Sequence, residues 1–491
     1  MTGAFGAAAP PGYKWVALSN TTIGTLMAAL DTNIVIIALP TIARQLPGTS
    51  VLSLLWILMG YSLVTAVVLL SFGRLSDQFG RTRLYTLGFA VFTVGSLLCG
   101  LSQSSIELIG FRMVQALGAG FIFSNSAAIL TDAFPANERG RALGINQISI
   151  VVGAVSGLVV GGILTSLAGW RWIFFVNVPI GIVATIWSHY RLRELASLDT
   201  VQHVDWAGNL TFAAGLTSIL VAVSFTALGL LGSVAFVVLL VLGIGLLGLF
   251  VYVESRVAHP MFDLSLFRLR AFSFSALAMF VNALARGAFS FVMVFYLQSP
   301  PHALSPIEAG LFLVPVSASL AAFGPVSGSL SDRYGPRGLA SLGLVVSAAG
   351  FLVLTQVTAD ASFSTLLPAF VLIGAGMGLF ASPNRAAMMN AVPPRRRGIA
   401  AGTGTTLINS GMTLSLGLAI LIMSRSLPFA SLDAIFLGAS TGAGAGLVPV
   451  TEFLSSVHLV FAISAGLLLA SVIPSVLRSG PAPPDRGGVA A

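Results

Sequence analysis

The stretch Leu30-Asp31-Thr32-Asn33-Ile34-Val35-Ile36-Ile37-Ala38-Leu39-Pro40 places one acid inside an apolar segment that runs from about residue 15 to residue 39. An apolar segment of this length predicts a helix that crosses a membrane. A carboxylate at bilayer depth costs about 3 kcal/mol or more, so we expect Asp31 to face a bundle interior or a water-filled path. Burial favours the neutral acid, and an acid that gains and loses a proton inside the membrane suits a proton-driven transporter. The alternative is that Asp31 only pairs with a buried Arg and holds helices together.

The composition extends this prediction to the whole chain. Of the 491 residues 56% are hydrophobic and only 8% are charged, whereas soluble domains carry about 25% charged residues. The chain is therefore predicted to be an integral membrane protein, with the lipid bilayer as its main partner. Its net charge of +8 reports orientation in the membrane and does not indicate nucleic-acid binding. The single cysteine, Cys99, excludes an internal disulfide, and the five histidines show no metal-ligand spacing, so no metal site is expected.

Fourteen segments are long and apolar enough to span a bilayer, and no alternating pattern indicates strands. Approximate bounds are 15–39, 51–73, 84–101, 108–130, 143–167, 172–189, 207–228, 231–253, 272–297, 307–330, 339–357, 366–388, 399–423 and 453–477. An even number puts both termini on one side. That side receives 18 of the 24 basic residues, and the opposite side receives three. This bias predicts cytoplasmic termini in the cell (inner) membrane.

The chain also repeats. The loop Gly73-Arg74-Leu75-Ser76-Asp77-Gln78-Phe79-Gly80-Arg81 recurs 255 residues later as Gly328-Ser329-Leu330-Ser331-Asp332-Arg333-Tyr334-Gly335-Pro336-Arg337. The offset predicts two related halves. Because the loop recurs eight segments later, and a six-helix half needs only six, two segments between the halves are extra helices.

The repeat and the composition predict five regions. They are a cytoplasmic N-terminus (1–14), a six-helix bundle (15–194), a linker with two extra helices (195–271), a second six-helix bundle (272–477) and a disordered cytoplasmic tail (478–491). The Gly-rich residues 424–453 are expected to form a flexible outer loop.

These motifs resemble those of the major facilitator superfamily. The repeated loop resembles its loop between helices two and three, which implies a gating role for Gly73, Asp77, Gly80 and Arg81 and for Gly328, Asp332, Gly335 and Arg337. The stretch Arg112 to Gly120 resembles its buried-Arg motif. Gly153, Gly157, Gly161 and Gly162 resemble its antiporter motif, with Leu158 where Pro is usual. Small residues at this spacing let helices pack closely.

Further stretches resemble the 14-helix drug:H⁺ antiporter family within that superfamily. They are Leu30-Asp31-Thr32, the run from Trp170 to Gly181, Asp205-Trp206-x-Gly208 and Ser305-Pro306-x-x-Ala309-Gly310. The resemblance implies an all-α integral membrane fold of two six-helix bundles plus two extra helices, 14 in total. It also implies proton-coupled export of small amphipathic compounds by alternating access.

The resemblance and the repeat together assign roles to individual residues. Asp31 and Arg112 are expected to couple protons, and Asn33, Gln115 and Arg286 to line the substrate cavity; Arg286 is the repeat equivalent of Asp31. A second Arg, Arg385, also falls inside a segment. Because no Walker phosphate loop is present, a proton gradient and no cofactor is expected to drive transport. No enzymatic activity and no obligate protein partner are expected.

Two other functions remain open at this point. One is transport by the same fold of a single endogenous, possibly anionic solute, since Arg112 and Arg286 could hold a negative group. The other is a receptor or scaffold that transports nothing, against which the buried Asp31 argues.

Overall fold

The computed structural model describes residues 12–135, 138–195, 205–257, 260–393, 396–427, 435 and 450–478. Within this part of the chain every regular element is helical, and 14 helical spans are long and apolar enough to cross a membrane. The predicted disordered tail from residue 479 and most of the predicted outer loop lie outside the described residues.

The first half contains α1 (Tyr13–Gln45), α2 (Val51–Phe79), α3 (Arg81–Leu101), α4 (Ser105–Ala133), α5 (Arg139–Leu167), α6 (Trp172–Phe175) and α7 (Asn177–Arg191). The linker contains α8 (Trp206–Ala227), α9 (Ser233–Arg256) and the short 3₁₀ helix η1 (Leu264–Arg268). The second half contains α10 (Arg270–Arg286), α11 (Phe289–Gln298), α12 (Pro306–Tyr334), α13 (Pro336–Leu354), α14 (Phe363–Asn390), α15 (Arg397–Ser426) and α17 (Val450–Leu477). The short α6 and α7 make one span, as do α10 and α11.

Local sequence explains several of these helix ends. Ser50 and Ser53 form a reciprocal capping box at the start of α2, and Ser305 and Glu308 form another at the start of α12, where Pro306 takes the first helical position. These side chains satisfy backbone N–H groups that have no partner within the helix. Both helices therefore begin at residues whose side chains cap them.

The repeat is visible in the backbone as well as in the residue types. Gly80 separates α2 from α3 with φ 105°, and Gly335 separates α12 from α13 with φ 79°. Both values lie in the region that side chains disfavour, so glycine permits the sharp helix-to-helix turn at both places. The two halves thus share this turn.

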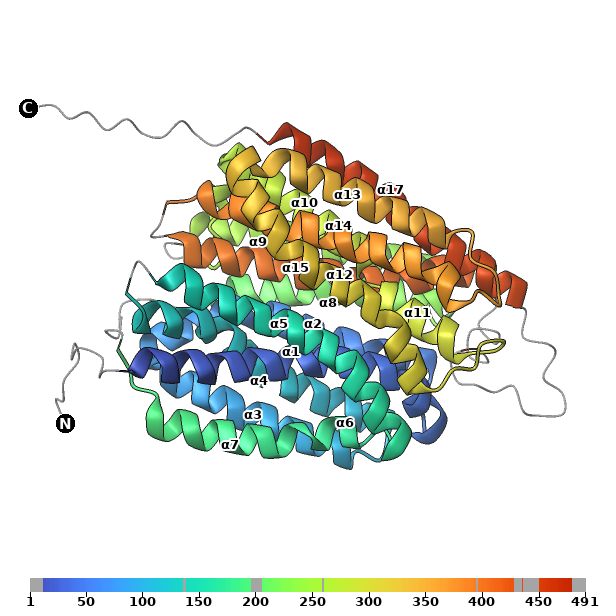
Figure 1. Cartoon of the computed structure of the whole chain (residues 1–491), viewed down its shortest axis with the longest axis horizontal. Helices are drawn as coiled ribbons and strands as arrows, with labels where there is room; N and C mark the ends of the chain where they lie inside the picture. The colour runs from blue at the N-terminus through green and yellow to red at the C-terminus, as the bar shows by residue number, and fades with distance from the viewer. Residues whose placement is uncertain are drawn as a thin grey trace, which may run out of the picture.

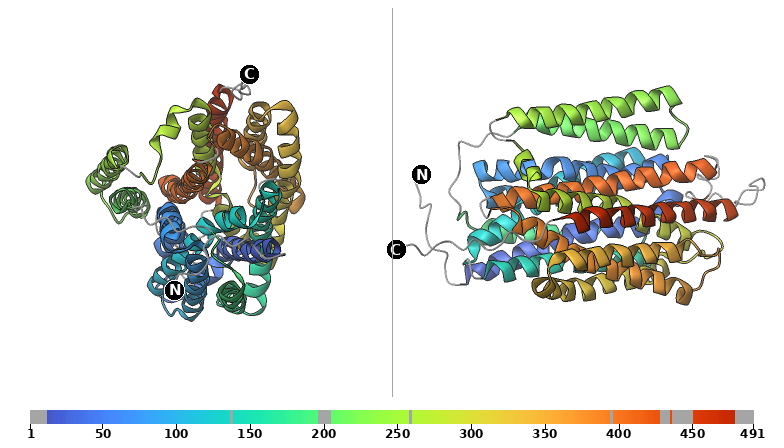
Figure 2. Two further views of the ribbon diagram at one scale, coloured as in Figure 1. Left: turned by 90° about the vertical axis from the view of Figure 1, so that its left-hand side faces the viewer. Right: turned by 90° about the horizontal axis from the view of Figure 1, so that it is seen from above.

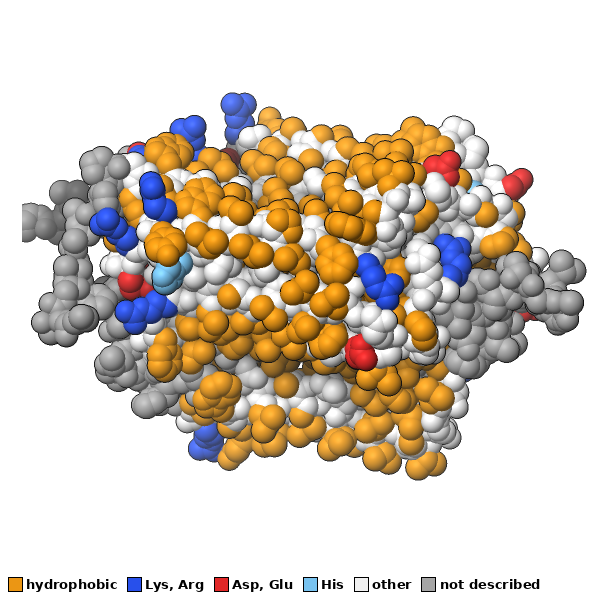
Figure 3. Space-filling model, turned by 90° about the horizontal axis from the view of Figure 1, so that it is seen from below, with side chains coloured by type: hydrophobic (Ala, Val, Ile, Leu, Met, Phe, Trp, Pro, Cys, Tyr) orange, Lys and Arg blue, Asp and Glu red, His pale blue; other side chains and the backbone are white. Residues whose placement is uncertain are grey.

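The helices form two bundles that lie side by side, the first half in blue to teal and the second in yellow to red (Figure 1). Residue Tyr13 of α1 and residue Leu477 of α17 lie at the same end of the bundle, which we call the Arg-rich end because most Arg side chains belong to it (Figure 3). The view in Figure 3 also shows a broad band of apolar side chains along the helices.

The linker helices form a separate hairpin beside the bundles (Figure 2). Helix α8 packs on α2 of the first half and on α15 of the second. Asn209 anchors it, because its amide donates to the Val67 carbonyl at 3.0 Å and to Ser71 Oγ at 2.5 Å. Helix α9 is mostly exposed and apolar, as expected of a helix that faces lipid.

The two halves meet closely at the end opposite the Arg-rich end. There Gln298 Nε2 donates to the Ile37 carbonyl at 3.0 Å, and the Ile307 N–H donates to Ser166 Oγ at 3.3 Å. A Cβ at Gly162 would lie 2.6 Å from the Pro306 carbonyl oxygen. Glycine is therefore required for α5 and α12 to approach this closely.

Arg478, assigned from the sequence to the tail, is buried just after α17. It donates to Asn384 Oδ1 at 3.0 Å and to the Pro336 carbonyl at 3.1 Å, and so ties α17 to α14 and α13. Burial, with the nearby charge of Arg337, lowers the pKa of Arg478 to about 10, which leaves it charged at neutral pH.

Candidate functional site: a buried charge network in the first half

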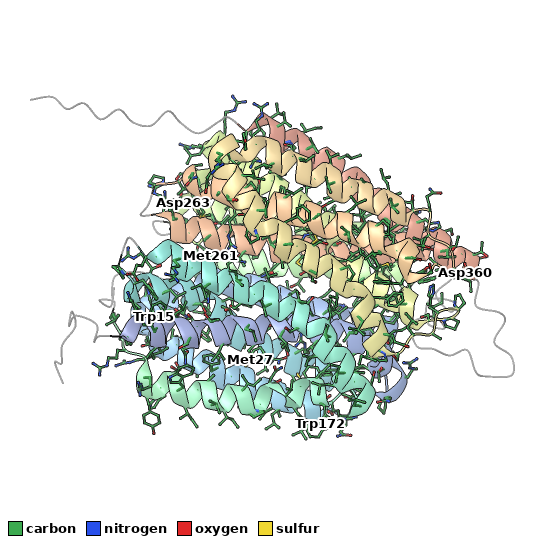
Figure 4. All side chains as sticks on the ribbon, viewed as in Figure 1. Trp15, Met27, Trp172, Met261, Asp263 and Asp360 are labelled. Carbon is green, nitrogen blue, oxygen red and sulfur yellow. The ribbon has the colours of Figure 1, made fainter. Side chains whose placement is uncertain are left out.

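Asp31 lies near the middle of α1, about one turn along from Met27, which is labelled at the centre of the first bundle in Figure 4. Arg112 Nη1 of α4 forms an ion pair with Asp31 Oδ2 at 2.5 Å. The amides of Gln115 and Asn177 donate to Asp31 Oδ1 at 2.9 Å and 3.0 Å. Three helices, α1, α4 and α7, therefore meet at one carboxylate.

The network is sealed from solvent. Asp31 is 0% exposed and Arg112 is 1% exposed. All three neighbouring side chains donate to the carboxylate, so the arrangement complements its ionised form. Two polar atoms of these side chains, Arg112 Nε and Asn177 Oδ1, have no hydrogen-bond partner among the described residues. Because Asp31 is fully buried, a proton can reach it only in a conformation that opens this site.

Aromatic packing holds the guanidinium in place. The Arg112 guanidinium carbon lies 4.1 Å from the centre of the Tyr61 ring of α2, which is a cation–π distance. Buried charges need such partners, and removal of one member of a buried pair typically destabilises a protein by about 3–5 kcal/mol. The ion pair thus links α1 to α4, and the cation–π contact links α4 to α2.

Reasoning from the sequence singled out Asp31, Arg112 and Gln115 but missed Asn177 and Tyr61. Asn177 stands in the motif from Trp170 to Gly181 as an uncharged polar residue in an apolar segment. That isolation was the available signal. Tyr61 has no comparable signal, because an aromatic residue in a spanning helix is common.

Gln115 belongs to the same network. The sequence predicts that it lines the substrate cavity, and in this structure its side chain is 0% exposed, accepts from Arg112 Nη1 at 2.6 Å and donates to Asp31. Since Gln115 follows Arg112 by one helical turn, both side chains lie on the same face of α4. Asn33, the second predicted cavity residue, is half-buried and donates to the carbonyl of Ala29 in its own helix at 3.2 Å.

The predicted glycine motif packs α5 directly against the helix that carries Asp31. A Cβ at Gly153 would lie 2.5 Å from the Leu26 carbonyl oxygen, and one at Gly157 would lie 2.6 Å from that of Leu30. Gly161 also faces α1, at Ile34 and Ile37, while Gly162 faces α12. Leu158, which replaces the usual Pro, is buried, and its carbonyl faces Gly310 of α12. The motif therefore sets the position of Asp31 relative to both halves.

The repeated loops carry charges that pair within one half. Arg81 Nε donates to Asp77 at 2.8 Å, and its Nη1 contacts Asp132 of α4 at 2.7 Å. Glu194 accepts from the Thr82 N–H at 3.0 Å and so caps the start of α3. Gly73 is open, with no atom near an added Cβ. These contacts lie entirely in the first half.

The second copy of the loop is more exposed. Asp332 and Arg337 lie on the surface of the Arg-rich end, and no ion pair links them to the first copy within the described residues. Gly328 packs near Ser382 of α14. The sequence implies a gating role for both copies, and among the described residues this structure pairs only the charges of the first copy.

Two arginines of the second half have no acidic partner among the described residues. Arg286 Nε donates to Asn282 Oδ1 on the same helix at 3.1 Å. Arg385 Nη1 of α14 donates to Gln147 Oε1 of α5 at 2.7 Å and so bridges the halves. Arg286 therefore does not pair with Asp31, whose carboxylate is occupied by Arg112.

The described residues contain no group of three or more His, Cys, Asp or Glu side chains that could hold a metal ion. The chemistry available at the site is proton transfer at Asp31 and hydrogen bonding by the surrounding amides and guanidinium.

Fourteen spans in two related halves, with a sealed acid in one of them, define a membrane transporter of the two-bundle class. The chain belongs to the major facilitator superfamily, whose family model matches residues 21–273 and 275–490. The 14 spans and the similar proteins place it with the 14-helix, drug:H⁺ antiporter-like family. The chain is thus a multi-pass membrane transporter and not an enzyme.

Several named proteins are similar to it. The riboflavin transporter RibZ of Clostridioides difficile is 32% identical over 419 residues, which cover 85% of this chain and 90% of RibZ. The tetracenomycin C resistance and export protein of Streptomyces glaucescens is 30% identical and covers 84% of this chain and 77% of its own length. The multidrug resistance protein Stp of Mycobacterium tuberculosis is 32% identical, covering 82% and 74%.

A solved structure shares the fold. The bacterial homologue of the human lysosomal transporter Spinster, in an inward-facing and unoccupied conformation, superposes with a TM-score of 0.68 over 96% of this chain and 98% of that chain. Its sequence is only 19% identical, so the likeness concerns the fold alone.

Proposed function

We propose that this protein exports small amphipathic compounds in exchange for protons, by alternating access of one site between its two halves. The single observation that carries the proposal is the sealed Asp31 network near the middle of α1. An acid that is neutralised inside the membrane only when the surrounding helices separate can link proton uptake to a change of conformation.

The coupling follows from the contacts of Asp31. When Asp31 is ionised, its ion pair with Arg112 and its hydrogen bonds to Gln115 and Asn177 hold α1, α4 and α7 together. Protonation removes the charge and turns one oxygen into a donor, so the donors that face it lose an acceptor. Because α5 packs on α1 through Gly153 and Gly157 and on α12 through Gly162, a shift of α1 is transmitted to the interface between the halves.

The orientation and energy source are part of the same proposal. The excess of Arg at the end where α1 begins supports cytoplasmic termini in the cell membrane. The contacts of Gln298 with Ile37 and of Ile307 with Ser166 would then close the outer side. No cofactor is needed, since the proton gradient supplies the driving force.

Proton release from reconstituted protein tests the proposal. Purified protein in liposomes with an internal pH dye should exchange protons for substrate, and Asp31→Asn should abolish the exchange while it still inserts and unfolds cooperatively. Full proton-driven export by Asp31→Asn would show that the coupling site lies elsewhere. Labelling of single cysteines placed near residues 83 and 360, in a variant without Cys99, tests the orientation.

A second candidate is a transporter dedicated to one solute. The similarity to a riboflavin transporter, at 32% identity, favours this alternative as much as the similarity to a multidrug resistance protein favours export of many compounds. A panel of unrelated substrates distinguishes the two, because a dedicated transporter accepts one chemical class only.

A further inference from the structure

The second half of the membrane interior holds a guanidinium with no carboxylate to neutralise it. Arg286 lies close to the middle of the span Arg270–Gln298, as its repeat equivalent Asp31 lies close to the middle of Tyr13–Gln45. The described acids of the second half lie near helix ends, at Glu308, Asp332, Asp360 and Glu452; Asp360 is labelled at the end far from the Arg-rich end in Figure 4. An Arg keeps its charge in a protein, so Arg286 remains a cation.

Arg286 and its neighbour Asn282 carry N–H donors that have no acceptor among the described residues. Its Nε uses Asn282 Oδ1, and within the described residues its two terminal nitrogens have no recorded hydrogen-bond partner. Asn282 is 5% exposed, and its buried Nδ2 has no partner in the part of the chain that the structure describes. Buried donors normally find an acceptor, and a group that lacks one is costly. Among the described residues, Asn282 Nδ2 and the two terminal nitrogens of Arg286 are therefore donors still open to an acceptor, which an oxyanion supplies.

Arg385 places a second unneutralised cation between the halves. Among the described residues its hydrogen-bond partner is Gln147 of α5, in the other half, and both side chains are exposed. Arg385 lies five residues from the Arg-rich end of α14, whereas Arg286 lies 16 residues from that end of α10. At 1.5 Å per residue the two guanidinium groups stand at depths that differ by about 16 Å.

The first half does not offset these two charges. Its acid, Asp31, is fully buried and is already paired with Arg112, so the pair contributes no net charge. Apart from this pair, Arg286 and Arg385 are therefore the charged side chains of the described membrane interior. The electrostatic potential of two positive charges without acidic partners attracts anions and repels permanent cations.

We propose that the transported compound is an organic anion, or a zwitterion that presents a carboxylate or another oxyanion. Arg286 and Asn282 bind its negative group at the middle of the membrane, and Arg385 receives it nearer the Arg-rich end by releasing Gln147. A guanidinium binds a planar oxyanion through two parallel hydrogen bonds, which a lysine does not reproduce. This inference names the substrate class of the proposed export function and so rests on it, but its test measures binding and needs no proton coupling.

The test compares dyes of opposite charge on the full-length protein. Fluorescence polarisation gives the affinity of purified protein for anionic dyes, 6-carboxyfluorescein and pyrenebutyrate, and for cationic ones, ethidium and rhodamine 6G. We expect an anionic dye to bind most tightly to the wild type. Arg286→Gln and Asn282→Leu should weaken that binding, the Arg variant by about tenfold or more, because a charge-assisted pair of hydrogen bonds is lost. Arg286→Lys should restore it only partly.

A matched control is Arg425→Gln, which removes an exposed Arg near the end of α15 on the opposite side and should leave every affinity unchanged. Tighter binding of the cationic dyes by the wild type, or unchanged anion binding in Arg286→Gln, would overturn the proposal. If Arg286→Gln does not fold, Arg385→Gln and Asn282→Leu carry the same comparison. Loss of proton exchange in Asp31→Asn without any anion preference would leave the proposed export function standing and refute this inference alone.

Discussion

Separation of the Asp31–Arg112 pair is the sharpest test of how this fold is held together. The perturbation is a double-mutant cycle with Asp31→Asn, Arg112→Gln and the combined variant, which replace each charge by a neutral amide of similar shape. The two charged atoms lie 2.5 Å apart in a fully buried site. At an effective dielectric constant of about 20, two unit charges at this distance attract by about 7 kcal/mol.

Most of that attraction is offset by desolvation, because both groups leave water when the protein inserts and folds. Either single variant leaves one charge buried alone and is expected to lose about 3–5 kcal/mol of stability. The Asp31→Asn variant should be the less stable of the two, since a guanidinium stays charged whereas a carboxyl group can be neutralised by a proton. The double variant has no charge left at this site, so its loss should be smaller than the sum of the single losses by at least about 2 kcal/mol.

The assay is unfolding by sodium dodecyl sulfate in mixed micelles, followed by circular dichroism and by fluorescence of the tryptophans. A control cycle on Arg81 and Asp132, which are about a quarter exposed, should give a coupling energy below about 1 kcal/mol. Additive losses in the Asp31–Arg112 cycle would refute the reasoning, because they would mean that the two charges do not stabilise each other in the folded protein.

Three further predictions concern other parts of the molecule. Gly157→Ala should destabilise the protein by about 1–3 kcal/mol and impair transport, because the added Cβ meets the Leu30 carbonyl at 2.6 Å. The control is Gly144→Ala in the same helix, where no described atom lies within 4 Å of an added Cβ, and it should lose no stability in the same unfolding assay. Asp77→Asn should leave stability within about 1 kcal/mol of wild type, since its partner Arg81 keeps Asp132, but should shift the population of inward-open and outward-open forms. Distances between spin labels on the two copies of the loop report that shift, and identical distributions would contradict a gating role. Arg478→Met should lower stability by about 1–3 kcal/mol because the acceptors at Asn384 and Pro336 lose their donor. An unchanged free energy of unfolding would mean that the cost of burying the charged guanidinium equals what these hydrogen bonds contribute.

The membrane spans and their repeat follow from sequence alone because the bilayer imposes them. A span must be apolar and long enough to cross the hydrocarbon core, and the polar loops between spans must not enter it, so composition marks each boundary. The turns at Gly80 and Gly335 are equally local, since only glycine readily takes their positive φ. Asp31 and Arg112 are also recognisable without a structure, because ionised side chains are rare in such segments.

The contacts between helices depend on the tertiary structure. In a soluble protein the apolar face of a helix identifies its buried side, but a membrane helix is apolar on its lipid side as well, so this signal is lost. Reasoning from the sequence therefore did not place Gln115 beside Asp31, and it missed Asn177 and Tyr61. Helix rotation decides all of these points: one face of α4 brings Gln115 to Asp31, and α7 brings Asn177 to the same carboxylate from 146 residues away. The sequence alone shows which polar residues lie inside membrane spans, and the packing of α1, α4, α5 and α7 determines which of them share a site.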